Sequence, residues 1–137
     1  MTEEPDVTVL VVDDHKPFRI AAAAVLRRAH GFTLVGEATD GSEAITKVAA
    51  LHPDLVLMDV RMPGVDGLAT TRYIADTWPD TRILLCSTYK LADLPEQARR
   101  SGAFAYVGKE ELTAAFLREL WDRRDEPAPP PAPSNPV

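Results

Sequence analysis

Residues 7–14 read VTVLVVDD, an apolar run that ends in two adjacent carboxylates. A second apolar run, LVLMD at residues 55–59, ends in a third carboxylate, Asp59. Short continuous apolar runs of this kind are typical of strands in a parallel sheet that is buried on both faces. Because parallel strands end at the same edge of a sheet, we expect Asp13, Asp14 and Asp59 to lie close together.

Strand-like and helix-like spacings of apolar residues alternate along the whole chain. The expected strands are residues 7–12, 34–38, 55–59, 82–87 and 105–107. The expected helices cover about residues 18–29, 44–49, 66–78, 93–101 and 111–124. This order predicts an α/β fold with a doubly wound, five-stranded parallel sheet and helices on both faces, a flavodoxin-like (βα)5 arrangement. The fourth helix is mostly polar, so we expect either a weakly anchored moving element or a plain surface helix.

Composition narrows the class of protein. The chain has 137 residues, 45% hydrophobic and 26% charged, which fits one domain with a substantial core. No apolar stretch reaches the roughly 18 residues that a membrane span needs. The start of the chain, with Glu3, Glu4 and Asp6, lacks the basic residues of a signal peptide, so we expect a cytoplasmic location. A net charge of -6 argues against nucleic-acid binding by the bulk surface.

The pattern also predicts how the chain is divided. Residues 1–6 form a short tail and residues 7–124 form the folded domain. Residues 125–137 hold six of the 12 prolines, and we expect them to be a disordered linker or C-terminal tail. We find no internal repeat.

Two more polar residues follow expected strands at the edge where the three aspartates lie. Ser87 ends the fourth strand and Lys109 follows the fifth. Together with Asp13, Asp14 and Asp59, they offer oxygen ligands for a divalent cation, a carboxylate nucleophile, and a hydroxyl and an ammonium for phosphoryl oxygens. The plainer interpretation is that the aspartates and the serine only cap helices and turns, and that the lysine is solvated surface.

The remaining chemically versatile side chains suggest structural roles. Cys86 lies inside an apolar run, so we expect a small buried hydrophobe and no disulfide. His15 either starts the first helix or borders the metal pocket. His30 and His52 lie at helix ends and show no ligand spacing. Trp121 fits the core-facing side of the last helix, and its alternative is a contact in a dimer.

Four segments resemble the receiver domain of two-component response regulators, over about residues 7–124. They are VVDDH at 11–15, LMDVRMPGVDG at 57–67, the pair ST at 87–88, and GAFAYVGK at 102–109. The Asp-Asp-His opening and the Lys-Glu pair at 109–110, where Lys-Pro is commoner, are most similar to the NarL/FixJ-type subfamily. Members of that subfamily usually carry a helix-turn-helix output domain. The resemblance implies the strand order 2-1-3-4-5.

The resemblance also implies a reaction. Asp59 would be the phosphoacceptor for a sensor histidine kinase or a small acyl-phosphate donor. Asp14, Asp59 and the backbone carbonyl of Arg61 would ligate Mg²⁺ or Mn²⁺, with Asp13 acting through water. Lys109 would contact the phosphoryl oxygens. The protein would then be a phosphoacceptor that phosphorylates and dephosphorylates itself, and not a turnover enzyme.

A switch is implied as well. The Ser87 hydroxyl would turn towards the phosphoryl group, and the Tyr106 ring would enter the space that it vacates. The face made by the fourth helix, fifth strand and fifth helix would repack and bind a second copy or a downstream protein. Thr88, Arg61 and Tyr89 are bulky residues at the entrance, and our hypothesis is that they prolong the life of the phosphorylated form.

The expected output domain does not fit in this chain. Only 13 residues follow Arg124, whereas two helices and a turn need roughly 20. We therefore expect no direct nucleic-acid binding by this chain, which is either a stand-alone receiver or a piece of a longer regulator.

Three rival functions deserve comparison. A flavodoxin-like carrier must cradle a phosphate in its first loop, where Asp13 and Asp14 would repel it. A haloacid-dehalogenase-type phosphatase needs a second aspartate two residues after the nucleophile, where Arg61 stands. A pseudo-receiver would keep the fold as a protein-binding module without being phosphorylated.

Overall fold

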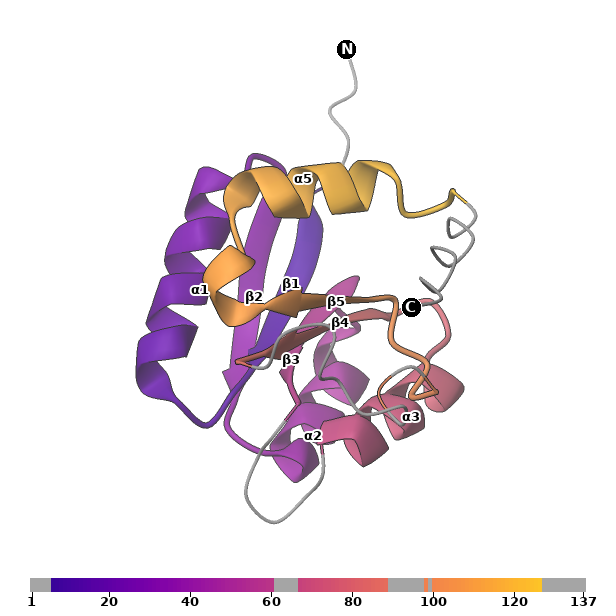
Figure 1. Ribbon diagram of the computed structural model, residues 1–137. Coiled ribbons are helices and arrows are strands. Elements are labelled where there is room, and N and C mark those ends of the chain that lie inside the picture. The colour runs from indigo at the N-terminus through magenta and orange to yellow at the C-terminus, as the bar shows by residue number, and fades with distance from the viewer. Residues whose placement is uncertain (1–5, 61–66, 89–97, 99, 127–137) are drawn as a thin grey trace, which may run out of the picture.

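Five parallel strands form the central sheet of the computed structural model, which describes residues 6–60, 67–88, 98 and 100–126 (Figure 1). The strands are β1 Val7–Val12, β2 Phe32–Ala38, β3 Leu55–Asp59, β4 Arg82–Ser87 and β5 Ala105–Gly108. Their order in the sheet is β2-β1-β3-β4-β5, and every neighbouring pair is parallel. The predicted fold class and strand order are therefore confirmed.

Helices cover both faces of the sheet (Figure 1). They are α1 Lys16–Arg28, α2 Gly41–Leu51, α3 Gly67–Thr77 and α5 Ala114–Asp122. Side chains alternate between the faces of a strand, and β1 shows this directly. Val9 and Val11 pack in the core beneath α1 and α5, whereas Leu10 and Val12 pack in a second core beneath α2 and α3. Among the described helices, none has the length and apolarity to cross a bilayer.

The expected fourth helix, about residues 93–101, falls largely outside the described residues. Of its positions, Ala98 is fully buried and Ser101 is almost fully buried. The Ser101 hydroxyl donates a hydrogen bond of 2.6 Å to the carbonyl of Ala98. The mobility of this helix stays a prediction.

The last helix begins later than expected. The prediction of a helix from Glu111 is wrong, because a short 3-10 helix, η2 Lys109–Glu111, precedes α5. The Thr113 side chain accepts a hydrogen bond of 3.1 Å from the Phe116 N–H, which caps α5 at its first turn. A side-chain oxygen that satisfies a free N–H in this way sets where a helix starts.

The second strand and the first helix also differ slightly from expectation. Strand β2 begins at Phe32, because Phe32 pairs with Val7 and extends the ladder by two residues. Helix α1 ends at Arg28, and Gly31 then turns the chain with a φ of 90°, a conformation that favours glycine.

Two of the predicted buried side chains lie in the core. Cys86 is fully buried, and burial raises the pKa of its thiol, so it acts as a small hydrophobe. The Trp121 ring is 7% exposed and meets the rings of Phe32 and Phe104 edge-on, at centroid distances of 6.3 and 6.5 Å. Trp121 is therefore a core residue of α5.

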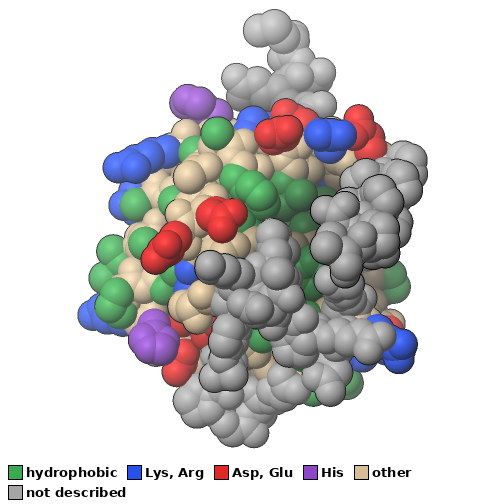
Figure 2. Space-filling model, in the orientation of Figure 1, with side chains coloured by type: hydrophobic (Ala, Val, Ile, Leu, Met, Phe, Trp, Pro, Cys, Tyr) green, Lys and Arg blue, Asp and Glu red, His purple; other side chains and the backbone are tan. Residues whose placement is uncertain are grey.

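Charged side chains of both signs are spread over the face that Figure 2 shows. Figure 2 shows Lys and Arg side chains spaced around the rim of this face, with carboxylates among them, and not gathered into one patch. Phosphate backbones bind to clustered cations, and the absence of nucleic-acid binding by this chain stays a prediction.

The cap at Thr113 leads to a first prediction. We expect Thr113→Ala to lower the free energy of unfolding by about 0.5–2 kcal/mol, because the Phe116 N–H loses its acceptor. The control is Thr46→Ala inside α2, where the hydroxyl only bonds back to the carbonyl of Ser42 and no N–H depends on it. Urea denaturation measures both. Equal effects of the two substitutions would contradict this helix start.

Candidate metal and phosphoryl-transfer site

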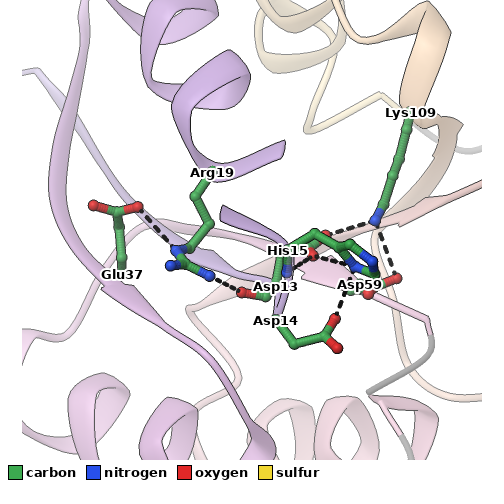
Figure 3. A network of polar contacts seen from close by, with 7 residues as sticks. All are labelled: Asp13, Asp14, His15, Arg19, Glu37, Asp59 and Lys109. Carbon is green, nitrogen blue, oxygen red and sulfur yellow. Dashed lines mark hydrogen bonds and ion pairs between the residues drawn. The ribbon is translucent and has the colours of Figure 1, made fainter. Parts of the chain in front are cut away.

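The register of the sheet brings the polar strand ends to one edge. Val12 pairs with Met58, so Asp13 and Asp59 follow on neighbouring strands at the same level. Asp59 in turn pairs with Cys86 on β4. Figure 3 shows Asp13 and Asp14 after β1, Asp59 at the end of β3 and Lys109 after β5 gathered at this edge.

Asp13 is held at each of its polar groups. Its backbone N–H donates a hydrogen bond of 3.0 Å to the carbonyl of Ala38 at the end of β2. Its carboxylate accepts a hydrogen bond of 2.8 Å at Oδ1 from the N–H of His15. The other carboxylate oxygen, Oδ2, forms an ion pair of 2.7 Å with Lys109 Nζ. Asp13 is fully buried, so these contacts compensate for the lost hydration of its charge.

Lys109 bridges the two buried carboxylates. Its ammonium lies 2.7 Å from Asp13 Oδ2 and 3.6 Å from Asp59 Oδ1, and 4.6 Å from the centroid of the Phe18 ring. Burial on its own lowers the pKa of Lys109. The hydrogen bond to Asp13 and the charge of Asp59 outweigh that effect, so the pKa is raised overall. Lys109 therefore stays charged at neutral pH.

Three aspartates and one histidine offer a set of cation ligands. Asp13, Asp14, His15 and Asp59 each offer one ligand atom, and these atoms all lie within 4.8 Å of one another. Three carboxylates against the single ammonium of Lys109 leave two negative charges, which one divalent cation would neutralise. Carboxylate oxygens suit hard cations such as Mg²⁺, so the residues fit the expected metal. Arg61, whose carbonyl was expected as a further ligand, lies outside the described residues.

His15 lies both at the start of the first helix and beside the acidic residues. It is the N-cap residue of α1, where its side chain makes no capping hydrogen bond. Its imidazole is 71% exposed, and Nδ1 lies 3.2 Å from Asp14 Oδ1. His15 therefore starts the helix and also borders the acidic cluster.

The two expected switch residues lie on the neighbouring strands β4 and β5. Ser87 is 3% exposed at the end of β4 and pairs with Gly108, the residue before Lys109. Tyr106 is half-buried, and its hydroxyl donates a hydrogen bond of 2.7 Å to the carbonyl of Ala98. The structure thus ties the Tyr106 ring to the segment where the fourth helix is expected. Of the predicted entrance residues, Thr88 is exposed, and Arg61 and Tyr89 lie outside the described residues.

Sequence reasoning missed two residues of the network, Arg19 and Glu37. Arg19 Nη1 donates a hydrogen bond of 2.8 Å to the backbone carbonyl of Asp13, and its Nε lies 3.4 Å from Glu37 Oε1 (Figure 3). The one available signal was the position of Arg19 on the first turns of the helix that follows the two aspartates.

The start of α3 packs closely against the backbone of Asp59. A Cβ added to Gly67, the first residue of α3, would lie 2.3 Å from the carbonyl oxygen of Asp59 and 2.8 Å from that of Val60. Real side chains do not approach backbone atoms so closely. Only glycine lets α3 start directly against the strand end that carries Asp59.

A sequence profile described as "Response regulator receiver domain" matches residues 9–120. Response regulator GacA of Pseudomonas viridiflava is 37% identical over 114 residues, which cover 83% of this chain and 53% of GacA. The chain belongs to the response regulator receiver domain family. The chain spans about half the length of the curated relatives that it matches.

Solved structures define the kind of receiver. The signal receiver domain of the putative response regulator NarL from Mycobacterium tuberculosis superimposes with a TM-score of 0.79 at 31% identity, covering 90% of this chain and 100% of that one. A response regulator from Burkholderia pseudomallei, described with a phosphorylated aspartic acid, calcium ion and citrate, has a TM-score of 0.74 at 27% identity. That match covers 88% of this chain and 70% of that one. Together with GacA, the NarL likeness supports a two-component receiver of the NarL/FixJ kind.

The contact at Gly67 leads to a second prediction. We expect Gly67→Ala to lower the free energy of unfolding by about 1–3 kcal/mol, because the new methyl group pushes on the backbone of Asp59 and Val60. The matched control is Gly36→Ala, whose methyl group would meet side-chain atoms of Leu51, Leu10 and Lys47 and not the backbone. Chemical denaturation compares the two. A smaller loss for Gly67→Ala than for Gly36→Ala would contradict this packing.

The raised pKa of Lys109 leads to a third prediction. A cation whose pKa is raised by folding stabilises the protein fully below its ordinary value of 10.5, and this contribution is lost as pH rises through the folded value. In metal-free buffer, wild type should therefore be more stable than Lys109→Met at pH 8, and the difference should shrink above about pH 10.5.

Urea denaturation as a function of pH measures this difference. The exposed Lys16 provides the control, because Lys16→Met should show no comparable loss in the same pH range. A difference between wild type and Lys109→Met that stays constant up to about pH 11.5 would contradict the ion pairing of Lys109 with Asp13 and Asp59.

Proposed function

We propose that this chain accepts a phosphoryl group on Asp59 in a reaction that depends on a divalent cation, and that it thereby serves as the receiver of a two-component pathway. The observation that carries this proposal is the placement of Asp59 Oδ1 3.6 Å from Lys109 Nζ and within the cluster of cation ligands. A carboxylate there has a cation partner for the charge that arrives with a phosphoryl group.

The reaction needs little beyond positioning. A carboxylate oxygen of Asp59 attacks the phosphorus of a phosphohistidine or acyl phosphate, the bond from phosphorus to the donor breaks, and its electron pair leaves with the donor. A carboxylate is a nucleophile without prior loss of a proton to a base, so no general base is required. The Lys109 ammonium contacts the incoming oxygens. Mg²⁺ or Mn²⁺, held by Asp13, Asp14 and Asp59, would supply neutralisation of the remaining charge.

Membership of the receiver domain family supports a histidine kinase as phosphoryl donor and an aspartate as acceptor. A receiver domain implies a sensor histidine kinase as partner, and the Burkholderia relative is described with a phosphorylated aspartic acid. The chain would be a phosphoacceptor in this reaction and not a turnover enzyme. A cytoplasmic location, where kinase and phosphodonor are available, is part of the proposal.

The response would be a change of surface. We infer that Ser87 and Lys109 contact the phosphoryl group, and that Tyr106 gives up its hydrogen bond to Ala98 as it moves. The surface beside β5 and α5 would then bind a second copy or a downstream protein. This chain would not itself bind nucleic acid, whether it acts as a stand-alone receiver or as a piece of a longer regulator.

The fourth prediction concerns the site of phosphorylation. After incubation with acetyl phosphate or phosphoramidate and Mg²⁺, we expect the intact mass of wild type to increase by one phosphoryl group. Asp59→Asn should show no increase, because an amide is not a nucleophile for phosphorus. Asp80→Asn, an exposed carboxylate in the turn before β4, is the matched control and should behave like wild type.

Two results would count against the proposal. An equal mass increase in Asp59→Asn would move the phosphoacceptor elsewhere. No increase in wild type with any donor would favour a pseudo-receiver, which binds partners without being phosphorylated.

A further inference from the structure

Arg19 links the acidic edge to the outer strand of the sheet. Its guanidinium extends from α1 and is mostly buried, with a side-chain exposure of 16%. Its Nη1 donates a hydrogen bond of 2.8 Å to the backbone carbonyl of Asp13, and its Nε lies 3.4 Å from Oε1 of Glu37 on β2. Figure 3 shows this connection on the side of Asp13 opposite Lys109.

The carbonyl that Arg19 holds belongs to the peptide between Asp13 and Asp14. A peptide unit is planar, so the direction of the Asp13 carbonyl also sets the direction in which the Asp14 backbone continues. The N–H and both carboxylate oxygens of Asp13 already have partners in Ala38, His15 and Lys109. Arg19 therefore completes the set of contacts that holds Asp13 and the peptide that leads into Asp14.

Glu37 in turn holds Arg19. A guanidinium has a rigid, planar set of donors, so it can hold a carbonyl and a carboxylate at fixed angles to each other. The backbone of Glu37 is itself in β2 and its carbonyl accepts a hydrogen bond from the Lys47 ammonium of α2. The chain of contacts thus runs from a strand in the sheet, through Arg19, to the peptide between the two aspartates.

We propose that Arg19, held by Glu37, is a positioning residue for the divalent cation: it orients the Asp13–Asp14 peptide so that the carboxylates are preorganised for metal binding. The inference rests on the proposed function, because it concerns the same metal site. Groups that orient metal ligands, without touching the metal themselves, typically change metal affinity by about 10–100-fold when removed.

Charge alone predicts the opposite change in Mg²⁺ affinity. Arg19 is a positive charge beside a cation site, so its removal should strengthen the binding of Mg²⁺ if charge alone matters. If Arg19 acts by positioning, its removal should weaken the binding. The direction of the change in affinity therefore separates the two explanations.

The test measures Mg²⁺ binding to the full chain by isothermal titration calorimetry, and the melting temperature without metal. For Arg19→Ala, we expect Mg²⁺ affinity to fall by about 10–100-fold. Arg19→Lys should lose less, since an ammonium can hold the carbonyl but cannot also hold Glu37 with the same geometry. Glu37→Gln should lose less than Arg19→Ala, because Arg19 keeps its bond to Asp13.

Arg72→Ala is the matched control. Arg72 also holds a backbone carbonyl, that of Arg100 at 2.7 Å, and a carboxylate, that of Asp76 at 3.2 Å, but it lies on α3. We expect this variant to bind Mg²⁺ as wild type does. A purely structural role of Arg19 would lower the melting temperature and leave the Mg²⁺ affinity of the folded protein unchanged.

The outcomes are distinct. Unchanged or tighter Mg²⁺ binding by folded Arg19→Ala would overturn the inference. If Arg19→Ala does not fold, Arg19→Lys and Glu37→Gln provide the test. Mg²⁺ affinity equal to that of wild type in both variants would overturn the inference. Wild type that binds no Mg²⁺ would instead overturn the proposed function.

Discussion

Mutual repulsion among Asp13, Asp14 and Asp59 is the constraint on which this edge of the molecule depends. Their ligand atoms lie within 4.8 Å of one another, together with one from His15. Like charges held this close favour any cation that comes between them. The ion pairs of Lys109 with Asp13 and Asp59 offset part of this repulsion. Two negative charges remain, which a divalent cation would neutralise.

The rest of the fold keeps these groups where they are. Strands β1 and β3 lie at the centre of the sheet between two hydrophobic cores, so the residues that follow them have little freedom. Gly67 allows α3 to pack directly against the backbone of Asp59. On the other side, Arg19 ties the peptide after Asp13 to β2. Packing and polar contacts together preorganise the carboxylates before any ligand binds.

Much of this arrangement could be predicted from the sequence. Buried parallel strands appear as continuous apolar runs, and polar residues that follow them must meet at one edge, so the aspartates, Ser87 and Lys109 were accessible to reasoning. The start of α5 could not be predicted from the sequence, because residues 110–112 favour a helix by propensity. The Thr113 side chain starts the helix later by bonding to the Phe116 N–H. Arg19 and Glu37 were missed because a bond between a side chain and a distant backbone depends on how α1 sits on the sheet, which spacing does not reveal.

Paramagnetic relaxation by Mn²⁺ in NMR spectra tests the central claim most directly, because the effect falls steeply with distance from the metal. We predict that substoichiometric Mn²⁺ broadens the amide signals of His15, Val60 and Lys109. The signals of Phe32 and Arg82, at the opposite edge about 20 Å along the strands, should stay sharp. Uniform broadening, or broadening centred on the opposite edge, would show that the carboxylates do not form one cation site.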